Sequence, residues 1–292
     1  MANINTEQGT IMKHFWDSLT RLFRRKSRDI HDIYDYSHIR AKRDPAKSET
    51  KILNYVWINK QRFSYEDESC MCRIPLHYID KAIENAKRYP DTQVRLWLDH
   101  NLLDQQSLFF VASHIHFAGA DNIAIHDLNE IPEYRDNPMF HPDDEDFKDS
   151  IWARVDIARL LALQYCLEDT EAQQVFYSDF DADDVKINSR SVHSIMQKYG
   201  LVLGATTHEH VENGYFGFHR RNKDVLNELV TRSFNAYEHS RHGAFSAFCT
   251  FKTVTLHKEN HIHPESAAVT VLPPTDYTIP KRQIYRDLKL NI

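Results

Sequence analysis

The sequence is poor in glycine and cysteine and contains no long apolar run. Seven glycines among 292 residues fall well below the roughly 7% that soluble proteins use. Neither the Walker nor the Rossmann glycine pattern occurs, which excludes the common nucleotide-binding designs built on a glycine loop. The four cysteines (Cys70, Cys72, Cys166 and Cys249) lack the spacing of a zinc knuckle.

Charge and hydropathy exclude two further classes of protein. The net charge of −6 and the pI near 6.3 provide no general basic surface for nucleic acid, so we expect no nucleic-acid partner. No apolar run approaches the roughly 18 residues of a membrane span, and no cleavable signal peptide is visible. We therefore expect a chain that folds in a reducing cytosol.

Residues 1–50 read as an N-terminal extension with a basic amphipathic helix and a connector. Apolar side chains recur at helical spacing over residues 11–23, and basic residues accompany them as far as residue 28. Such a helix could lie on an anionic membrane surface, or it could simply dock on the main domain. Residues 51–292 are expected to form one α/β domain, because strand and helix patterns alternate along them.

The periodicity of residues 51–292 favours repeated βαβ units and a mainly parallel sheet. Strands are predicted over residues 51–59, 94–99, 123–127, 175–177, 201–205 and 267–273, and helices over 76–86, 101–117, 151–167, 189–199 and 223–239.

An acidic cluster follows one of these strands and is the strongest functional signal. The apolar run Val175-Phe176-Tyr177 leads into Asp179, Asp181, Asp183 and Asp184. Unpaired carboxylates this close repel one another, and a divalent cation with oxygen ligands, Mn²⁺ or Mg²⁺, removes that cost. A solvated acidic loop and a two-metal nuclease or phosphatase site remain open at this point. An EF-hand is excluded, because its sixth and twelfth positions hold Asp184 and Arg190 rather than Gly and Glu.

Four short motifs occur in a fixed order along the chain: Tyr-Val-Trp-Ile-Asn at 55–59, Asp-Ile-Ala-Arg at 156–159, Tyr-Ser-Asp-Phe-Asp at 177–181, and Glu-Asn-Gly-Tyr-Phe-Gly at 212–217. Together they resemble the DXD-containing glycosyltransferases of the GT-A fold, over roughly residues 51–280. That group includes the glucosylating domains of large clostridial toxins and related bacterial effectors. The resemblance implies a GT-A-type, Rossmann-like mixed sheet, mainly parallel and flanked by helices.

The resemblance also implies roles for three residues of the nucleotide side. Trp57 looks like the aromatic residue that stacks on the uracil of a UDP-sugar. Asp156 and Arg159 look like the pair that contacts the ribose, the sugar hydroxyls and the diphosphate. From the sequence alone, Trp57 could equally be a core residue, and Asp156 and Arg159 could form an ordinary helix-face ion pair.

The metal ligands expected from the resemblance are carboxylates of the DXD motif. Asp179 and Asp181 form that motif, with Asp181 as the direct ligand, and an alternative register uses Asp181 and Asp183. The usual C-terminal ligand and lid tryptophan have no counterpart near the end of the sequence. A replacement ligand is expected among His261, His263 and Glu265, with His263 the first choice.

Glu212 and Asn213 resemble the Glu-Asn pair of effectors that attach N-acetylglucosamine to arginine. A glutamate beside the sugar could orient the acceptor or take its proton. The histidine that accompanies this pair in those effectors is missing at the matching spacing, and His208 and His210 are the nearest substitutes. The expected catalytic residues are thus Asp156, Arg159, Glu212 and Asn213.

The functional expectation is a metal-dependent, retaining hexosyltransferase. It would use Mn²⁺ or Mg²⁺ and UDP-glucose or UDP-N-acetylglucosamine, and its acceptor would be a protein or a glycan. The family further implies a toxin-like effector secreted into a host cell without a cleavable signal peptide. Two rivals remain: a non-catalytic GT-A-like protein that binds nucleotide and metal, and a metal-dependent phosphohydrolase.

Overall fold

A computed structural model describes most of the predicted α/β domain. The described residues are 50–59, 74–141, 151–182, 185–207, 210–239, 256 and 261–270. The amphipathic helix predicted at residues 11–23, and with it the membrane contact expected of residues 11–28, lies outside them. The proposed boundary between an extension and the main domain at residue 50 therefore stays a prediction.

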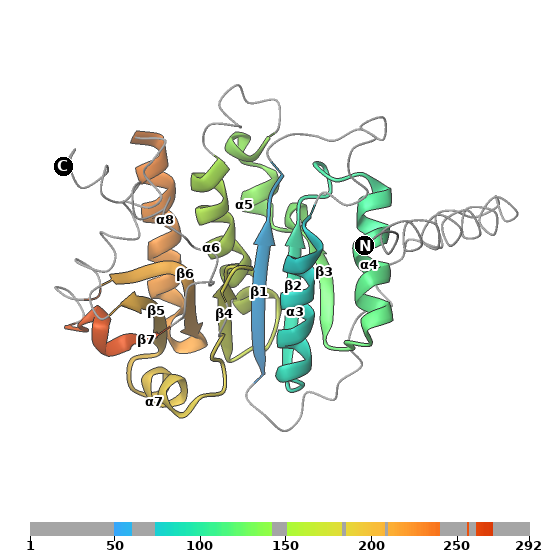
Figure 1. The fold of residues 1–292 in the computed structure, drawn as a ribbon. Coiled ribbons are helices and arrows are strands. Elements are labelled where there is room, and N and C mark those ends of the chain that lie inside the picture. The colour runs from blue at the N-terminus through green and yellow to red at the C-terminus, as the bar shows by residue number, and fades with distance from the viewer. Residues whose placement is uncertain are drawn as a thin grey trace, which may run out of the picture. The chain divides into compact units, whose positions relative to one another are not determined.

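The strands in the described part of the chain form one seven-stranded sheet in the order β3-β2-β1-β4-β6-β5-β7 (Figure 1). Among the described strands only β6 runs antiparallel to its neighbours, β4 and β5. This confirms the predicted fold class, a Rossmann-like mixed sheet that is mainly parallel and flanked by helices. The strand bounds are β1 Lys51–Trp57, β2 Thr92–Leu98, β3 Ile123–Asp127, β4 Gln174–Ser178, β5 Leu201–Thr207, β6 His210–His219 and β7 Ala268–Thr270.

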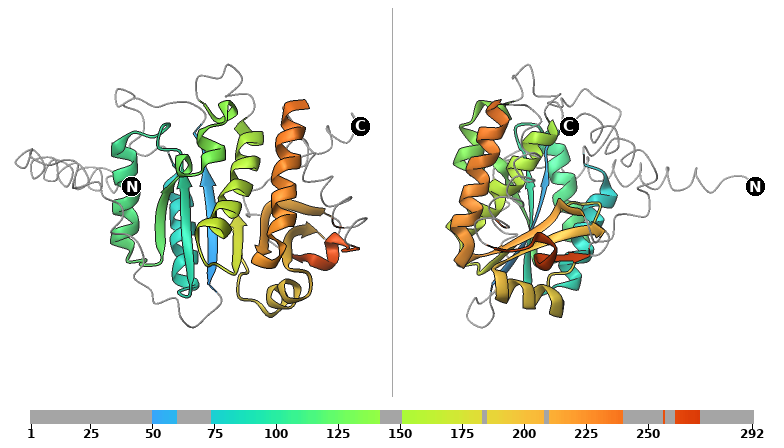
Figure 2. Two further views of the ribbon diagram at one scale, coloured as in Figure 1. Left: turned by 180° about the vertical axis from the view of Figure 1, so that it is seen from behind. Right: turned by 90° about the vertical axis from the view of Figure 1, so that its left-hand side faces the viewer.

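Helices cover both faces of the sheet (Figure 2). One face packs against α6 and α8, and the other packs against α3, α4 and α7. No helix in the described part of the chain is long and apolar enough to span a bilayer. The helix bounds are α3 Leu76–Arg88, α4 Gln105–Ala118, α5 Pro132–Arg135, α6 Ile151–Asp169, α7 Arg190–Tyr199 and α8 Lys223–His239, with short 3₁₀ turns η2 Leu128–Glu130, η3 Pro138–Phe140, η4 Arg220–Asn222 and η6 Pro264–Ala267.

The two faces of the sheet follow from the alternation of side chains along each strand. Ile52 and Tyr177 lie in the core under α6 and α8, whereas Leu53 and Phe176, each one residue away, lie in the core under α3, α4 and α7. Because both faces are covered, the central strands are apolar at consecutive positions rather than at every second one.

Helix ends are set by short polar or glycine residues. The helix predicted at 101–117 begins four residues later, because the Asp104 side chain accepts a hydrogen bond from the Ser107 backbone N–H at 2.7 Å and caps α4. The helix α4 ends at Gly119 and α7 ends at Gly200, both in the left-handed conformation that glycine adopts without strain.

The strand β6 was not assigned from the sequence, although it is paired on both edges. Its two internal glycines weaken the strand pattern. Gly217 is required by packing, since a Cβ at this position would lie 2.6 Å from Cδ1 of Phe176 on β4. The close approach of β6 to β4 therefore explains why a glycine occurs at this position, and this glycine is one reason why the sequence pattern did not predict β6.

Replacing Phe176 by alanine should lower the free energy of unfolding by about 3–5 kcal/mol, because its fully buried ring leaves a cavity in the β4 layer. Phe117→Ala is the matched control, since this ring is 77% exposed and should change stability by less than about 0.5 kcal/mol. Urea unfolding of both variants measures the difference. Equal effects would contradict the described core.

Candidate functional site

The candidate site lies where β1 and β4 end at the same edge of the sheet. These strands are parallel neighbours, with Asn54 opposite Tyr177. Trp57 is the last residue of β1, and Asp179 and Asp181 follow the last residue of β4. The residues predicted to bind the base and the metal therefore share the carboxyl edge of the sheet, where open α/β sheets bind ligands.

The backbone of Asp179 continues the β4–β6 ladder one step beyond β4. Its N–H donates to the Gly214 carbonyl at 2.7 Å. A Cβ at Gly214 would lie 2.7 Å from Oδ2 of Asp179, so only glycine lets the carboxylate occupy this position. The glycine in the Glu212-to-Gly217 motif is thus explained by close approach of Asp179.

The Arg159 guanidinium on α6 joins the predicted residues into one buried network. It is paired with Asp156 one helical turn earlier and donates to the Asn213 backbone carbonyl at 2.5 Å. The same Nη1 lies 3.4 Å from Oδ1 of Asp179. Asn213 closes the network by donating from Nδ2 to Oδ1 of Asp156 at 3.0 Å. The structure therefore brings together four residues that were predicted from three separate motifs.

The network combines one permanent positive charge with two carboxylates. Burial raises the pKa of Asp156, and the Arg159 charge opposes that rise. Burial disfavours the charged guanidinium, but the oxygen groups around it, Tyr177 first, outweigh burial and raise the pKa of Arg159. The arginine stays charged at any physiological pH, and its side chain is 7% exposed. A cation this buried depends on its anionic partners.

Tyr177 holds Asp179 from the sheet side. Its hydroxyl donates to Oδ1 of Asp179 at 2.5 Å, and the guanidinium carbon of Arg159 lies 4.8 Å from its ring centroid. Burial raises the pKa of the Tyr177 phenol well above its ordinary value, so the phenol keeps its proton and remains a donor.

Trp57 belongs to a group of aromatic side chains beside the acidic residues. Its half-buried ring lies 5.5 Å from that of Tyr78 and 6.2 Å from that of Phe180, between ring centroids. Tyr78 and Phe180 stack at 5.7 Å, and Tyr55 stacks under Phe180 at 4.9 Å. Phe180 is the central residue of the Asp-Phe-Asp motif, so the motif anchors itself on these rings.

Tyr78 on α3 connects the rings with both aspartates, and sequence reasoning missed it. Burial is the main cause that raises the pKa of Tyr78, and the charges of Asp181 and then Asp179 raise it further. Both carboxylates therefore lie close enough to the Tyr78 hydroxyl for their charges to act on it. The only sequence signal for this position was the apolar face of α3, which does not specify the site.

The donor set is suited to Mn²⁺ or Mg²⁺, which prefer carboxylate oxygens. Asp179 and Asp181 follow β4 two residues apart, and the charges of both act on Tyr78. Within the described ranges no three acidic, histidine or cysteine side chains group closely enough to hold a metal. Asp183, the third predicted carboxylate, and Asp184 lie outside those ranges. Asp179 and Asp181 would therefore supply two of the protein ligands.

The remaining predicted residues lie in different places. Glu212 is on β6 next to Asn213, and its side chain is outside the described part, as is that of His210; His208 is wholly outside it. His263 is exposed just before η6 and leads into β7. The strand β7 is parallel to β5 and three places from β4 in the sheet, and the role of His263 as a metal ligand stays a prediction.

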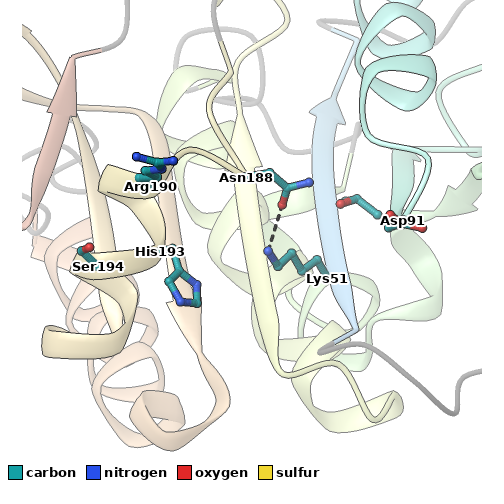
Figure 3. A pocket seen from close by; sticks show the side chains of 7 residues that line it. Lys51, Asp91, Asn188, Arg190, His193 and Ser194 are labelled. Atoms are coloured by element: carbon teal, nitrogen blue, oxygen red, sulfur yellow. Dashed lines mark hydrogen bonds between the residues drawn. The ribbon is translucent and has the colours of Figure 1, made fainter.

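A separate hollow lies at the opposite edge of the sheet (Figure 3). It has a volume of about 620 Å³, and Lys51 and Thr92, the first residues of β1 and β2, lie in its wall. Lys51 donates to Asn188 at 2.9 Å across it. Because its walls come from the amino ends of the strands, this hollow is distinct from the candidate site.

No protein-family model matches the chain, and no curated protein matches its sequence. Among solved structures, the PaToxG glycosyltransferase is similar at 16% identity and a TM-score of 0.47, over 71% of this chain and 68% of that one. The bacterial N-acetylglucosamine transferase NleB is similar at 13% and 0.45, over 76% and 92%. A 4-diphosphocytidyl-2C-methyl-D-erythritol synthase from Anaerococcus prevotii DSM 20548 is similar at 10% and 0.38, over 84% and 97%. At these values the likeness concerns the outline of the fold and assigns no activity.

Arg159→Met should destabilise the protein by about 3–5 kcal/mol near pH 8, because it leaves the buried Asp156 carboxylate without its cation. Loss of that cation raises the pKa of folded Asp156 further above the unfolded value. The folded variant then binds a proton more tightly than its unfolded chain, so its free energy of unfolding falls as pH rises above about 4. The deficit relative to wild type should therefore be smaller at pH 5 than at pH 8, as measured by urea unfolding.

The matched control is Arg232→Met, which breaks the half-exposed pair with Glu228 on α8. Surface pairs of this kind contribute about 0–1 kcal/mol, so the control should show little loss at either pH. An Arg159→Met deficit below about 1 kcal/mol, or one that is the same at both pH values, would contradict the buried network.

Proposed function

We propose that this chain is a divalent-metal-dependent glycosyltransferase of the GT-A type that uses a UDP-sugar. The observation that carries the proposal is the arrangement at the carboxyl edge of the sheet. Asp179 and Asp181 leave β4 beside the half-buried Trp57 ring, and the Arg159 cation lies directly behind Asp179 at 3.4 Å. Carboxylates for a cation, an aromatic face for a base and a fixed positive charge are the groups that a nucleoside diphosphate requires.

Each of these groups has a distinct role in the proposed reaction. Trp57 holds the base by stacking, and Asp179 and Asp181 hold Mn²⁺ or Mg²⁺. When bound, the ion neutralises the charge that develops on the leaving diphosphate. Arg159 fixes the position of Asp179 through their ion pair, so the carboxylate is already oriented before a ligand arrives. We assign Asp156 and Asn213, which share the Arg159 network, to the sugar and ribose side.

Transfer breaks the bond between the anomeric carbon and the β-phosphate oxygen, and its electron pair leaves with UDP. The acceptor forms the new bond to the same carbon and loses a proton, for which Glu212 is the proposed carboxylate base. Retention of configuration is proposed from the family resemblance. Glucose and N-acetylglucosamine are the proposed sugars, and a protein or glycan is the proposed acceptor.

The proposal predicts that the protein releases UDP slowly from UDP-glucose or UDP-N-acetylglucosamine in Mn²⁺ and not in EDTA. Asp181→Asn should reduce the rate of UDP release roughly 100-fold, because loss of a carboxylate ligand weakens binding of the metal ion that would stabilise the leaving group. A panel of UDP- and GDP-sugars with Mn²⁺, Mg²⁺ or EDTA measures this. Asp121→Asn, on an exposed turn before β3, is the control and should retain full activity.

Other outcomes of this panel identify the rival functions. UDP binding without turnover, even with candidate acceptors, would indicate a nucleotide-binding protein. Hydrolysis of simple phosphodiesters that Trp57→Ala leaves unchanged would indicate a phosphohydrolase. Turnover that is insensitive to EDTA and to Asp181→Asn would contradict the proposed site altogether.

We further propose that the enzyme acts in a cytosol, including that of a host cell, and meets anionic membrane through residues 11–28. Vesicles containing phosphatidylserine should carry the full chain upward in a flotation gradient and leave behind a chain that lacks residues 1–28. The binding should weaken at high salt, because basic residues supply part of the attraction. Equal flotation of both chains would contradict the membrane role.

A further inference from the structure

The side chain of Asn59 is a buried amide whose nitrogen has no hydrogen-bond acceptor among the described residues. The residue follows β1 by two positions and is 5% exposed. Its side-chain oxygen accepts a hydrogen bond from Nε1 of Trp57 at 2.5 Å. Its Nδ2 is buried and has no hydrogen-bond partner among the described residues. Native proteins seldom leave a buried donor unpaired, so a position like this calls for an explanation.

The chemistry of the indole fixes which way this amide faces. An indole N–H can only donate, so the amide atom next to it must be the oxygen. Turning the amide by 180° would place two donors against each other and would lose the bond. The NH₂ group is therefore presented on the side away from the indole nitrogen, and it can only donate.

The position of the donor indicates the part of the ligand that it meets. Asn59 is tied to the indole edge of Trp57, whereas the Arg159 cation and Asp179 are linked to each other through β4, β6 and α6. A diphosphate belongs at the charged groups, and a flat ring belongs at the aromatic group. A donor beside the aromatic group is matched to an acceptor on the edge of that ring.

We propose that Asn59 Nδ2 donates to the carbonyl oxygen at position 4 of a uracil base stacked on Trp57. This inference rests on the proposed function and adds the residue that selects the base. Cytosine carries an amino group at position 4, so two donors would face each other and the Asn59 nitrogen would stay unpaired. Sites built around one hydrogen bond reject ligands that cannot complete it.

Calorimetric titration with UDP and with CDP in Mn²⁺ tests the inference on the full chain. Wild type should bind UDP at least about tenfold more tightly than CDP. Asn59→Ala should lose about tenfold in UDP affinity, keep its CDP affinity and so lose the preference. Asn59→Asp keeps an oxygen for Trp57 and replaces the donor by an acceptor, so it should favour CDP.

Asn222→Ala is the matched control, because this asparagine donates to the Tyr199 carbonyl at the end of α7 instead. It should keep the wild-type preference. If the alanine variant of Asn59 does not fold, as judged by circular dichroism, the near-isosteric aspartate variant decides the question by the direction of its preference.

The failures of the inference and of the proposed function are distinguishable. Wild type that binds UDP and CDP equally, or an Asn59 variant with an unchanged ratio of the two affinities, overturns the role of Asn59 and leaves the function standing. Wild type that binds neither nucleotide in Mn²⁺ overturns both.

Discussion

The candidate site depends on one buried cation. Arg159 contacts a carboxylate on its own helix, a backbone carbonyl on β6 and the carboxylate that follows β4. Three separate elements thus share one charge, and a shift of any of them would remove one of the partners of a cation in a poorly hydrated environment. The desolvation cost of such a group is high, which makes the arrangement rigid rather than strongly stabilising.

A second buried polar group, the side chain of Asn54, fixes the register of β1 relative to its two neighbouring strands. Asn54, within β1, donates to the Phe176 carbonyl of β4 at 3.0 Å and accepts from Nε1 of Trp97 on β2 at 2.8 Å. A shift of either neighbour by one residue would break these bonds and would also exchange the two faces of that strand. Since Trp57 lies three residues beyond Asn54, this register decides where the indole stands relative to Asp179.

The parts of the structure that the sequence predicted are those that depend on local pattern. The apolar runs that end at Trp57 and Tyr177 indicated buried strands, and strand ends indicated the edge at which Asp179 and Asp181 would lie. The Asp156 and Arg159 spacing indicated one helix face. These signals need only neighbours along the chain, and the structure confirms the elements that they predicted.

The rest depended on contacts between distant segments. Gly217 weakened the strand pattern of β6 in the sequence. The glycine is required there because it packs against the Phe176 ring, which lies 41 positions earlier in the sequence, so local pattern could not explain it. Tyr78 and Asn59 carry no motif, and their relevance comes only from the charges and the indole that the fold places beside them. The roles predicted for Glu212, Asp183 and His263 remain predictions.

The antiparallel direction of β6 has a consequence for how this chain can change over time. Because β6 runs against β4, its first residues return to the point at which the chain left β4, and Asp179 meets Gly214 there. Everything between these residues is a closed excursion that contains α7 and β5. Lengthening such an excursion adds little closure entropy, so insertions within it can be accommodated without moving its two ends. Asp181 and Asn213 lie close to the two ends of this segment. New surface can therefore be acquired around α7, in its middle, at little risk to the residues of the candidate site.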